Sequence, residues 1–357
     1  MNPAFFSKNV VRWYQSNKRD LPWRRSTDPY KIWLSEIMLQ QTRVSQAEPY
    51  YKEVVRKYPT IFRLAAAKEQ EILRLWQGLG YYSRARNMLK CAQKVVKDYK
   101  GKFPHNVLEL KKLSGIGDYT AAAIASIAFH ERVAVVDGNV YRVLARVFGR
   151  TEDIALPSGR KFFQELANAV IANADPGTYN QAIMEFGALQ CTPKAPDCSG
   201  CPMRSGCVAF AQNMVEQLPV KSRRTKIRDR FIYYLLLRHN EKLIVHKRQH
   251  DDIWKGLVDF PSLESKVKLK KSEVPDRLAS HFKLRKINPS KAVVSEEYKH
   301  ALTHQLLHVR FVEVAVSKSL AEICRGIKGS QVVGIRQLEN LPKPALIVRY
   351  LGKRSLS

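Results

Sequence analysis

Acidic residues are scarce in this sequence of 357 residues, where 32 aspartates and glutamates stand against 61 lysines and arginines. An enzyme of small metabolites rarely needs a net charge of +29, so the composition disfavours that class of protein. A well-solvated surface explains many charges, but it does not explain an excess of one sign. The charge therefore favours a polyanionic partner, with nucleic acid ahead of an acidic membrane surface.

Long apolar runs and internal repeats are also absent. No stretch of about eighteen apolar residues occurs, which excludes a membrane-spanning helix. Residues 1–20 lack the apolar core of a signal peptide, and no repeat of solenoid period is present. Because 45% of the residues are hydrophobic, wholesale disorder is excluded, and we expect a soluble intracellular protein with at least two domains.

The chain changes character near residue 217. Residues 1–216 carry apolar residues at three- and four-residue spacing between short Gly/Pro breaks, which predicts an all-helical domain. Residues 217–229 are basic and polar and begin with a proline turn, which is typical of a linker. Residues 230–357 contain runs rich in Val, Ile and Tyr around one helix-like piece, which predicts an α+β domain.

Cysteine is infrequent, but four of the six cysteines cluster as Cys-X6-Cys-X2-Cys-X5-Cys between residues 191 and 207. They are Cys191, Cys198, Cys201 and Cys207. Disulfides are rare inside cells, and structural zinc prefers two Cys-X2-Cys knuckles where this loop has one. One loop that supplies four thiolates suits an iron–sulfur cluster, so the spacing favours that cluster and leaves zinc as the alternative.

A Gly-Ile-Gly turn at residues 115–117 lies between two helical segments. Glycine lets the backbone turn sharply and approach a partner closely, and the amides that begin the next helix can hold a phosphate. An ordinary helix–helix turn with a glycine cap is the alternative interpretation. Gly115 and Gly117 are therefore candidate phosphate contacts.

Two carboxylates stand out by their surroundings. Glu36 lies within an apolar segment, where it shares a helix face with Ile32 and Gln40. A half-buried glutamate has a raised pKa and can act as a general acid, whereas the alternative is a solvent-facing polar stripe. Asp137 ends an apolar run before Gly-Asn-Val, which is also typical of a helix N-cap, and both roles can hold together.

The turn, the aspartate and the cysteine spacing together resemble the helix–hairpin–helix DNA glycosylase superfamily, in its branch with an iron–sulfur loop. The resemblance covers residues 1–215 and implies that superfamily's all-α fold. Bifunctional members place a lysine on the helix after the turn, and the matching position here is Tyr119. Because a phenol cannot form a Schiff base, this sequence argues against strand cleavage through an amine.

Further segments resemble the adenine DNA glycosylases of the MutY type. They are residues 21–24, 34–42, 78–87, 137–140 and 180–182. The resemblance implies a monofunctional enzyme of base excision repair that hydrolyses the N-glycosidic bond of adenine mispaired with 8-oxoguanine or guanine. It also implies one [4Fe-4S] cluster on the four cysteines and duplex DNA as partner. We expect a monomer without a membrane partner, in a bacterial-type cytoplasm and on the nucleoid when bound to DNA.

The same resemblance assigns roles to residues. Glu36 would protonate the adenine, and Asp137 would stabilise the oxocarbenium ion or form a transient covalent intermediate. Tyr119 and Asn139 would organise this pocket. Tyr81 would wedge beside the 8-oxoguanine, and Gln41 would enter the base stack. The remaining candidate substrate contacts of this region are Arg24, Leu79 and Gln181.

Residues 254–261 mark the second domain as similar to the Nudix-like domain of the same family. The following stretch is basic and lacks the acidic pairs that hold magnesium in Nudix hydrolases, which excludes nucleotide hydrolysis and suits a grip on DNA. The family's Phe-Ser-His loop for 8-oxoguanine corresponds to Leu302, Thr303 and His304, with leucine in place of the aromatic residue. A plain strand is the alternative interpretation for this segment.

A DNA-binding protein without enzymatic activity is the rival from another class. It would account for the charge and for the phosphate turn. It would give no reason for Glu36 and Asp137 in their sequence contexts, so an enzyme is the stronger hypothesis.

Overall fold

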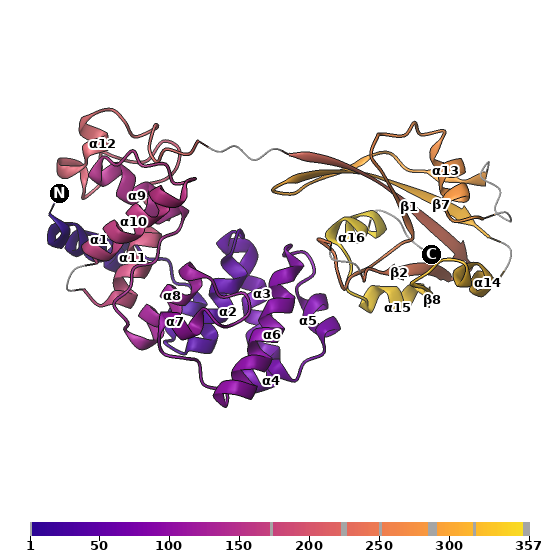
Figure 1. The fold of residues 1–357 in the computed structure, drawn as a ribbon, viewed down its shortest axis with the longest axis horizontal. Helices are drawn as coiled ribbons and strands as arrows, with labels where there is room; N and C mark the ends of the chain where they lie inside the picture. The colour runs from indigo at the N-terminus through magenta and orange to yellow at the C-terminus, as the bar shows by residue number, and fades with distance from the viewer. Residues whose placement is uncertain are drawn as a thin grey trace. The chain divides into compact units, whose positions relative to one another are not determined.

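The protein is described here by a computed structural model that covers residues 2–171, 174–222, 227–249, 252–284, 291–316 and 319–352. The chain forms two compact units (Figure 1). The first unit contains Met1–Ala67 and Asn87–Arg224. The second contains Thr225–Ser357 together with Lys68–Arg86, a segment that the predicted division at residue 217 places elsewhere.

The first unit is built from helices. They are α1 (Pro3–Asn17), α2 (Pro29–Leu39), α3 (Val44–Lys57), α4 (Ile61–Ala65), most of α6 (Tyr82–Tyr99), α7 (Val107–Leu110), α8 (Asp118–Phe129), α9 (Gly138–Phe148), α10 (Pro157–Val170), α11 (Pro176–Leu189) and α12 (Val208–Ala211), with 3₁₀ turns at Pro22–Arg25 and Arg204–Gly206. Helix α8 packs against α2 and α11, and α11 also packs against α1 and α9. Because α8 is rich in alanine and almost wholly buried, its neighbours approach closely and form the centre of the unit.

Local sequence fixes where the central helices begin. Asp28 accepts a hydrogen bond from the Tyr30 amide and precedes a proline in the first turn of α2. Asp175 caps α11 in the same way through the Thr178 amide. Gly149 ends α9 in the left-handed conformation, at φ 62°, as glycine commonly does after a helix.

The second unit is a mixed sheet with helices around it. Its described strands are β1 (Arg228–His239), β2 (Lys242–Lys247), β3 (Val258–Asp259), β4 (Ser262–Ser265), β5 (Val293–Val294), β6 (Tyr298–Ala301), β7 (Gln305–Ala315) and β8 (Ser330–Gly334). They are ordered β3-β2-β1-β7-β5, with β4 on β1, β6 on β7 and β8 on β2. The central pair β1–β7 is parallel, and the other pairs are antiparallel.

Both faces of the central strand pair are covered. Alternate residues of β1 point to opposite faces, so Tyr233 joins a core with α13 (Val274–His281), while Tyr234 faces the other way. On that second side Phe311 stacks on Tyr234 and on Tyr350 of α16 (Ala345–Leu351). The described helices of this unit also include α5 (Glu69–Leu75), α14 (Leu320–Arg325) and α15 (Ile335–Asn340).

The predicted fold class, a helical domain followed by an α+β domain, is confirmed. The predicted linker, residues 217–229, contains three different regions. Leu218 is buried and its carbonyl accepts a hydrogen bond from Arg146, residues 223–226 lie outside the described residues, and β1 already begins at Arg228. None of the described helices is long and apolar enough to cross a bilayer.

Candidate active site

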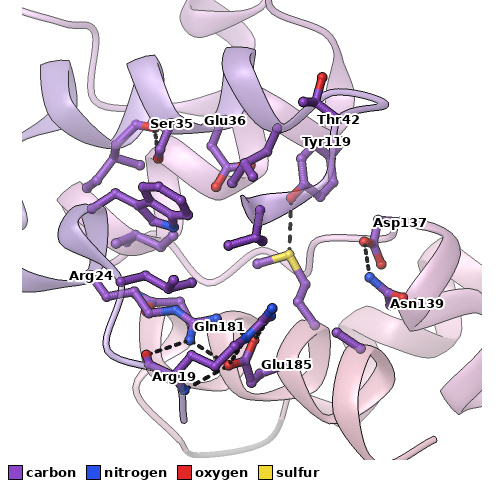
Figure 2. A pocket seen from close by; sticks show the side chains of 18 of the residues that line it. Arg19, Arg24, Ser35, Glu36, Thr42, Tyr119, Asp137, Asn139, Gln181 and Glu185 are labelled. Carbon is purple, nitrogen blue, oxygen red and sulfur yellow. Dashed lines mark hydrogen bonds and ion pairs between the residues drawn. The ribbon is translucent and has the colours of Figure 1, made fainter. Parts of the chain in front are cut away.

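A cavity of about 290 Å³ in the first unit gathers the predicted catalytic residues (Figure 2). Of the predicted residues, it is lined by Arg24, Glu36, Tyr119, Asp137, Asn139 and Gln181. They come from the first 3₁₀ turn, α2, α8, the start of α9 and α11, so five separate parts of the helical unit build one site.

Glu36 lies on the buried α2 and is only 6% exposed, so the solvent-facing interpretation is wrong. Burial raises the pKa of Glu36 to about 7, although the nearby Tyr119 hydroxyl acts to lower it. Within the described residues, Glu36 Oε2 has no hydrogen-bond partner. A carboxyl group that is half protonated near neutral pH, with an oxygen left for a ligand, suits a general acid.

Tyr119 occupies the first turn of α8, and its hydroxyl donates to Met184 Sδ at 3.1 Å. Burial raises the pKa of Tyr119 well above its usual value, and the nearby Glu36 and Asp137 carboxylates raise it further. The phenol therefore stays protonated, and it can act as a hydrogen-bond donor in the cavity but not as a nucleophile.

Asp137 is the N-cap of α9, so this interpretation of the sequence is confirmed. Its Oδ1 accepts from the Val140 amide at 2.8 Å, and its Oδ2 accepts from Asn139 Nδ2 at 2.9 Å. Burial raises the pKa of Asp137, while these hydrogen bonds oppose that rise. The cap thus fixes a carboxylate at the cavity wall and supports its charged form with two donors.

Arg142 fixes the orientation of the Asn139 amide, and the sequence analysis did not find it. Arg142 Nη2 donates to Asn139 Oδ1 at 2.9 Å, which turns the amide nitrogen towards Asp137. Its Nε donates to the carbonyl of Cys191 at 2.7 Å. The available signal was an arginine among the apolar residues of α9. Through Arg142 and Asn139, consecutive hydrogen bonds join the cysteine loop to the Asp137 carboxylate.

Glu185 is a second residue that the sequence analysis missed. Its side chain is 1% exposed, and it accepts two hydrogen bonds from Arg24, each 2.8 Å long, and further ones from Arg19. Although burial raises the pKa of Glu185, its bonds to Arg19 and Arg24 prevail and lower the pKa to about 2. This permanent anion holds the Arg24 guanidinium against the cavity (Figure 2).

Gln181 is placed by a neighbouring helix. Its Oε1 accepts from the Tyr14 hydroxyl at 2.9 Å, and its side chain lines the same cavity. The bond from Tyr14 thus fixes the Gln181 amide group at the cavity wall.

The second unit holds another group of predicted residues. Tyr81 is 42% exposed, and its hydroxyl is hydrogen bonded to Thr303 Oγ1, in the loop between β6 and β7. The strand interpretation of that loop is therefore wrong. His304 is exposed, and its carbonyl accepts from the Arg228 amide at 3.0 Å. Leu79, by contrast, is 4% exposed and does not project from this unit.

Three predicted residues lie outside the cavity wall in the first unit. Gln41 is exposed directly after α2, at φ 54°, in the left-handed region. Gly115 has φ 80°, and a Cβ there would lie 2.9 Å from Asn87 Cβ, so the turn requires glycine. Gly117 is the N-cap of α8 and leaves that end without a side-chain cap. The Ile116 amide of this turn donates to the Leu113 carbonyl at 3.2 Å, whereas the first amides of α8 receive no side-chain cap and suit a ligand such as phosphate.

Comparison with known proteins decides the family. A family model for the HhH-GPD superfamily of base excision DNA repair proteins matches residues 34–170, and a NUDIX domain model matches residues 232–353. The adenine DNA glycosylase of Buchnera aphidicola subsp. Schizaphis graminum is 32% identical over 346 residues, which cover 95% of this chain and 96% of that protein. The chain belongs to the adenine DNA glycosylase family.

Other relatives agree. The human adenine DNA glycosylase is 45% identical over 225 residues, covering 60% of this chain and 41% of the human protein. Among solved structures, a thermostable thymine-DNA glycosylase matches with a TM-score of 0.53 at 29% identity, over 58% of this chain and 95% of its own. The family, the enzyme class and the Nudix-like second domain that the sequence predicted are therefore confirmed. The protein is a DNA glycosylase of base excision repair.

The cysteine loop of this glycosylase carries thiols within electrostatic reach of one another. Cys191, Cys198 and Cys207 each act to raise the pKa of Cys201, after burial. All six cysteines are free, so the disulfide alternative finds no support. In the parts of the chain that the structure describes, no three metal-binding side chains converge into a formed metal site. The donors are nevertheless four thiols in one loop, the set that an iron–sulfur cluster takes.

Arg146 supports that loop from α9. Its guanidinium lies 3.5 Å from Cys191 Sγ and donates to the carbonyls of Thr192 and Pro193, at 2.7 and 3.1 Å. Arg146 thus fixes the start of the loop, from Cys191 to Pro193, against α9.

Proposed function

We propose that this glycosylase removes adenine from mispairs with 8-oxoguanine in duplex DNA and leaves an abasic site without cutting the strand. The observation that carries the proposal is that a protonatable Glu36 and a hydrogen-bonded Asp137 line one cavity of about 290 Å³. The position where lyases of this superfamily carry lysine is occupied by Tyr119, whose buried phenol has no amine chemistry.

The adenine must leave the duplex stack before these groups can reach it. Protonated Glu36 then donates its proton to a ring nitrogen, which makes the base a better leaving group. Asp137 stabilises the positive charge that develops on the sugar, or attacks it to form a transient bond. Water then adds to the sugar carbon in place of the departed adenine, displaces Asp137 if it is bonded there, and leaves the abasic site. Arg24 and Gln181 would contact the base, and Tyr119 and Asn139 would keep the two carboxyl groups in place.

We propose that Cys191, Cys198, Cys201 and Cys207 hold one [4Fe-4S] cluster. When bound, the cluster cross-links the loop that follows α11. Breaking a glycosidic bond transfers no electron, so the catalytic steps belong to the carboxyl groups. Arg142 and Arg146 would pass the order of the loop to α9 and thus to Asp137.

The base opposite the adenine would be recognised by the second group of residues. We assign this role to Tyr81 and Thr303, which are hydrogen bonded to each other, with His304 in the same loop. Separately, Gln41 of the first unit would enter the base stack. An aromatic ring and a hydroxyl on exposed turns can stack on one base and donate to its edge. The net charge of +29 suits binding to duplex DNA. We infer that the protein acts as a monomer in the cytoplasm.

A gel assay tests the proposed function. A duplex with adenine opposite 8-oxoguanine, labelled on the adenine strand, is incubated with the enzyme and analysed with and without hot alkali. Strand breaks that need alkali are the expected result. Breaks without alkali would show a lyase and overturn the assignment of Tyr119. An intact strand under both conditions, with the duplex bound, would show a different target base.

The rate of adenine excision is expected to fall with rising pH. Because Glu36 works in its protonated form and its pKa is raised to about 7, the single-turnover rate should decline above that pH by about tenfold per unit. The measurement is a series of single-turnover rates between about pH 6 and pH 9, with DNA binding determined at each pH as the control. A rate that does not change over this range would show that Glu36 is not the acid.

Replacing Cys198 by alanine is expected to remove most of the bound iron. Four thiolates share the cluster, so the loss of one opens it. Iron content and visible absorbance of the purified protein are the measurements, and Cys324→Ala, outside the loop, is the matched control. Iron content equal to that of the unaltered protein would exclude Cys198 as a ligand.

A further inference from the structure

The turn at residues 78–82 is held in a conformation that its neighbours impose. Gly78, Gly80 and Tyr81 all have positive φ, at 103°, 77° and 47°. This region is unfavourable for a residue with a Cβ such as tyrosine. Trp76 Nε1 donates to the carbonyl of Gly80 at 3.0 Å, and Arg84 Nη2 donates to the same oxygen at 3.2 Å. The Tyr81 side chain is exposed as a consequence of this fixed backbone.

Lys343 is a buried cation near this turn, within the same unit. It is 4% exposed, and its Nζ donates to the carbonyls of Leu338, Glu339 and Leu341 at 2.5, 3.1 and 2.8 Å. These carbonyls lie in the last turn of α15 and just beyond it. An ammonium group has three protons, so all of its hydrogen-bonding capacity is used to shape residues 338–343. Burial lowers the pKa of Lys343 to about 8.

The backbone of Lys343 contacts both ends of the turn. Its amide donates to Gln77 Oε1 at 3.0 Å. Its carbonyl accepts from the Tyr82 hydroxyl at 3.3 Å, and that hydroxyl in turn lies 3.4 Å from the Gly78 amide nitrogen. The side chain of Lys343 thus orders its own segment, and its backbone holds Gln77 and Tyr82, which flank the turn that carries Tyr81.

A second loop of the sheet unit supports the same segment. Arg86 Nη1 donates to the carbonyl of Lys255 at 2.6 Å. A Cβ added at Gly256 would lie 3.0 Å from Leu73 Cδ1 and 3.2 Å from Glu69 Oε1, so this loop and α5 are in close contact. The segment 68–86 is therefore anchored at both ends, and Lys343 supplies the anchor next to Tyr81.

We propose that Lys343 is a positioning residue for recognition of the base opposite the adenine, because it fixes the turn that presents Tyr81 to Thr303. It touches no reacting atom and acts through the side chains of Gln77 and Tyr82, which flank the turn. The inference rests on the proposed function, in which Tyr81 and Thr303 contact 8-oxoguanine. Loss of the ammonium would release its three carbonyls, loosen residues 338–343 and so free both ends of the turn.

The anchor itself is tested by hydrogen exchange, which needs no DNA. Lys343→Met keeps most of the length of the side chain and removes its charge. Amide exchange in residues 77–84 is expected to become about tenfold faster, since a local restraint on opening is lost. Lys328→Met, an exposed lysine of the same unit, is the control and should leave exchange unchanged. Exchange in Lys343→Met equal to that of the unaltered protein would overturn the proposal.

The recognition role is tested with two duplexes that differ only in 8-oxoguanine or guanine opposite the adenine. In Lys343→Met the preference for 8-oxoguanine is expected to fall about tenfold, while the single-turnover rate on the guanine duplex changes by less than about twofold. The effect should disappear in a Thr303→Ala background, because Tyr81 then has lost its partner. An equal loss on both duplexes, or an undiminished effect in that background, would show a merely structural role.

Two outcomes separate this inference from the proposed function. If the unaltered enzyme shows no preference for 8-oxoguanine, the proposed function fails, and the exchange experiment alone decides whether Lys343 anchors the turn. If Lys343→Met does not fold, Gln77→Met replaces it, since this change removes the acceptor of the Lys343 amide and leaves the ammonium in place. Unchanged exchange and unchanged preference in Gln77→Met would likewise overturn the proposal.

Discussion

Glu36→Gln is expected to lower the rate of adenine excision by about 10²–10⁴-fold, the usual contribution of general acid catalysis. Glutamine has nearly the same shape and fills the same space on α2, but it cannot donate a proton with the raised pKa of the buried carboxyl group. The measurement is the single-turnover rate on the adenine:8-oxoguanine duplex. Affinity for that duplex should be retained, because the change removes no positive charge.

The control for this variant is Glu53→Gln, an exposed carboxylate of α3 that pairs with Arg56. This variant also changes a carboxylate to an amide. It should leave the rate of adenine excision within about twofold of that of the unaltered enzyme, as surface substitutions usually do. A Glu36→Gln enzyme as fast as the control would remove Glu36 from the mechanism. A melting curve for each variant separates lost chemistry from lost folding.

Asp137→Asn is expected to slow excision by about 10²–10³-fold, the cost of removing one preorganised electrostatic contact. Asparagine is as good an N-cap as aspartate, so α9 should keep its start and the protein its stability. Asp137→Ala serves as the comparison, because it removes both the charge and the cap and should also lower the stability by about 1 kcal/mol. Rates and melting temperatures of the two variants distinguish the two roles of this residue.

Equal activity of Asp137→Asn and the unaltered enzyme would leave Asp137 as a helix cap only. If instead both variants lost stability equally, the hydrogen bond from Asn139 rather than the cap would hold the start of α9. The two roles are separable because Oδ1 accepts the cap bond, whereas Oδ2 faces Asn139.

The sequence predicted well what depends on neighbours along the chain. The apolar flanks of Glu36 implied its burial, and the Gly-Asn-Val after Asp137 implied its cap. Each of these outcomes follows from local periodicity or from a turn, which one sequence displays directly.

What the sequence did not predict depends on residues far apart in the chain. Glu185 is 161 positions from Arg24, and no spacing rule links an ion pair of that separation. The bond from Arg142 to the carbonyl of Cys191 spans 49 positions and uses a backbone acceptor that any residue type offers. The attachment of residues 68–86 to the sheet unit likewise depends on tertiary packing, which periodicity does not encode.

The second unit is built from two separate stretches of the chain, and this affects how it forms during biosynthesis. Residues 68–86 leave the ribosome well before the strands that complete their unit. At about 5–20 residues per second, the delay is on the order of ten seconds or more. During this interval Leu73 lacks Gly256 and its loop as neighbours. The nascent chain therefore carries an apolar segment that stays uncovered on this side until the loop around Gly256 has been made and has folded.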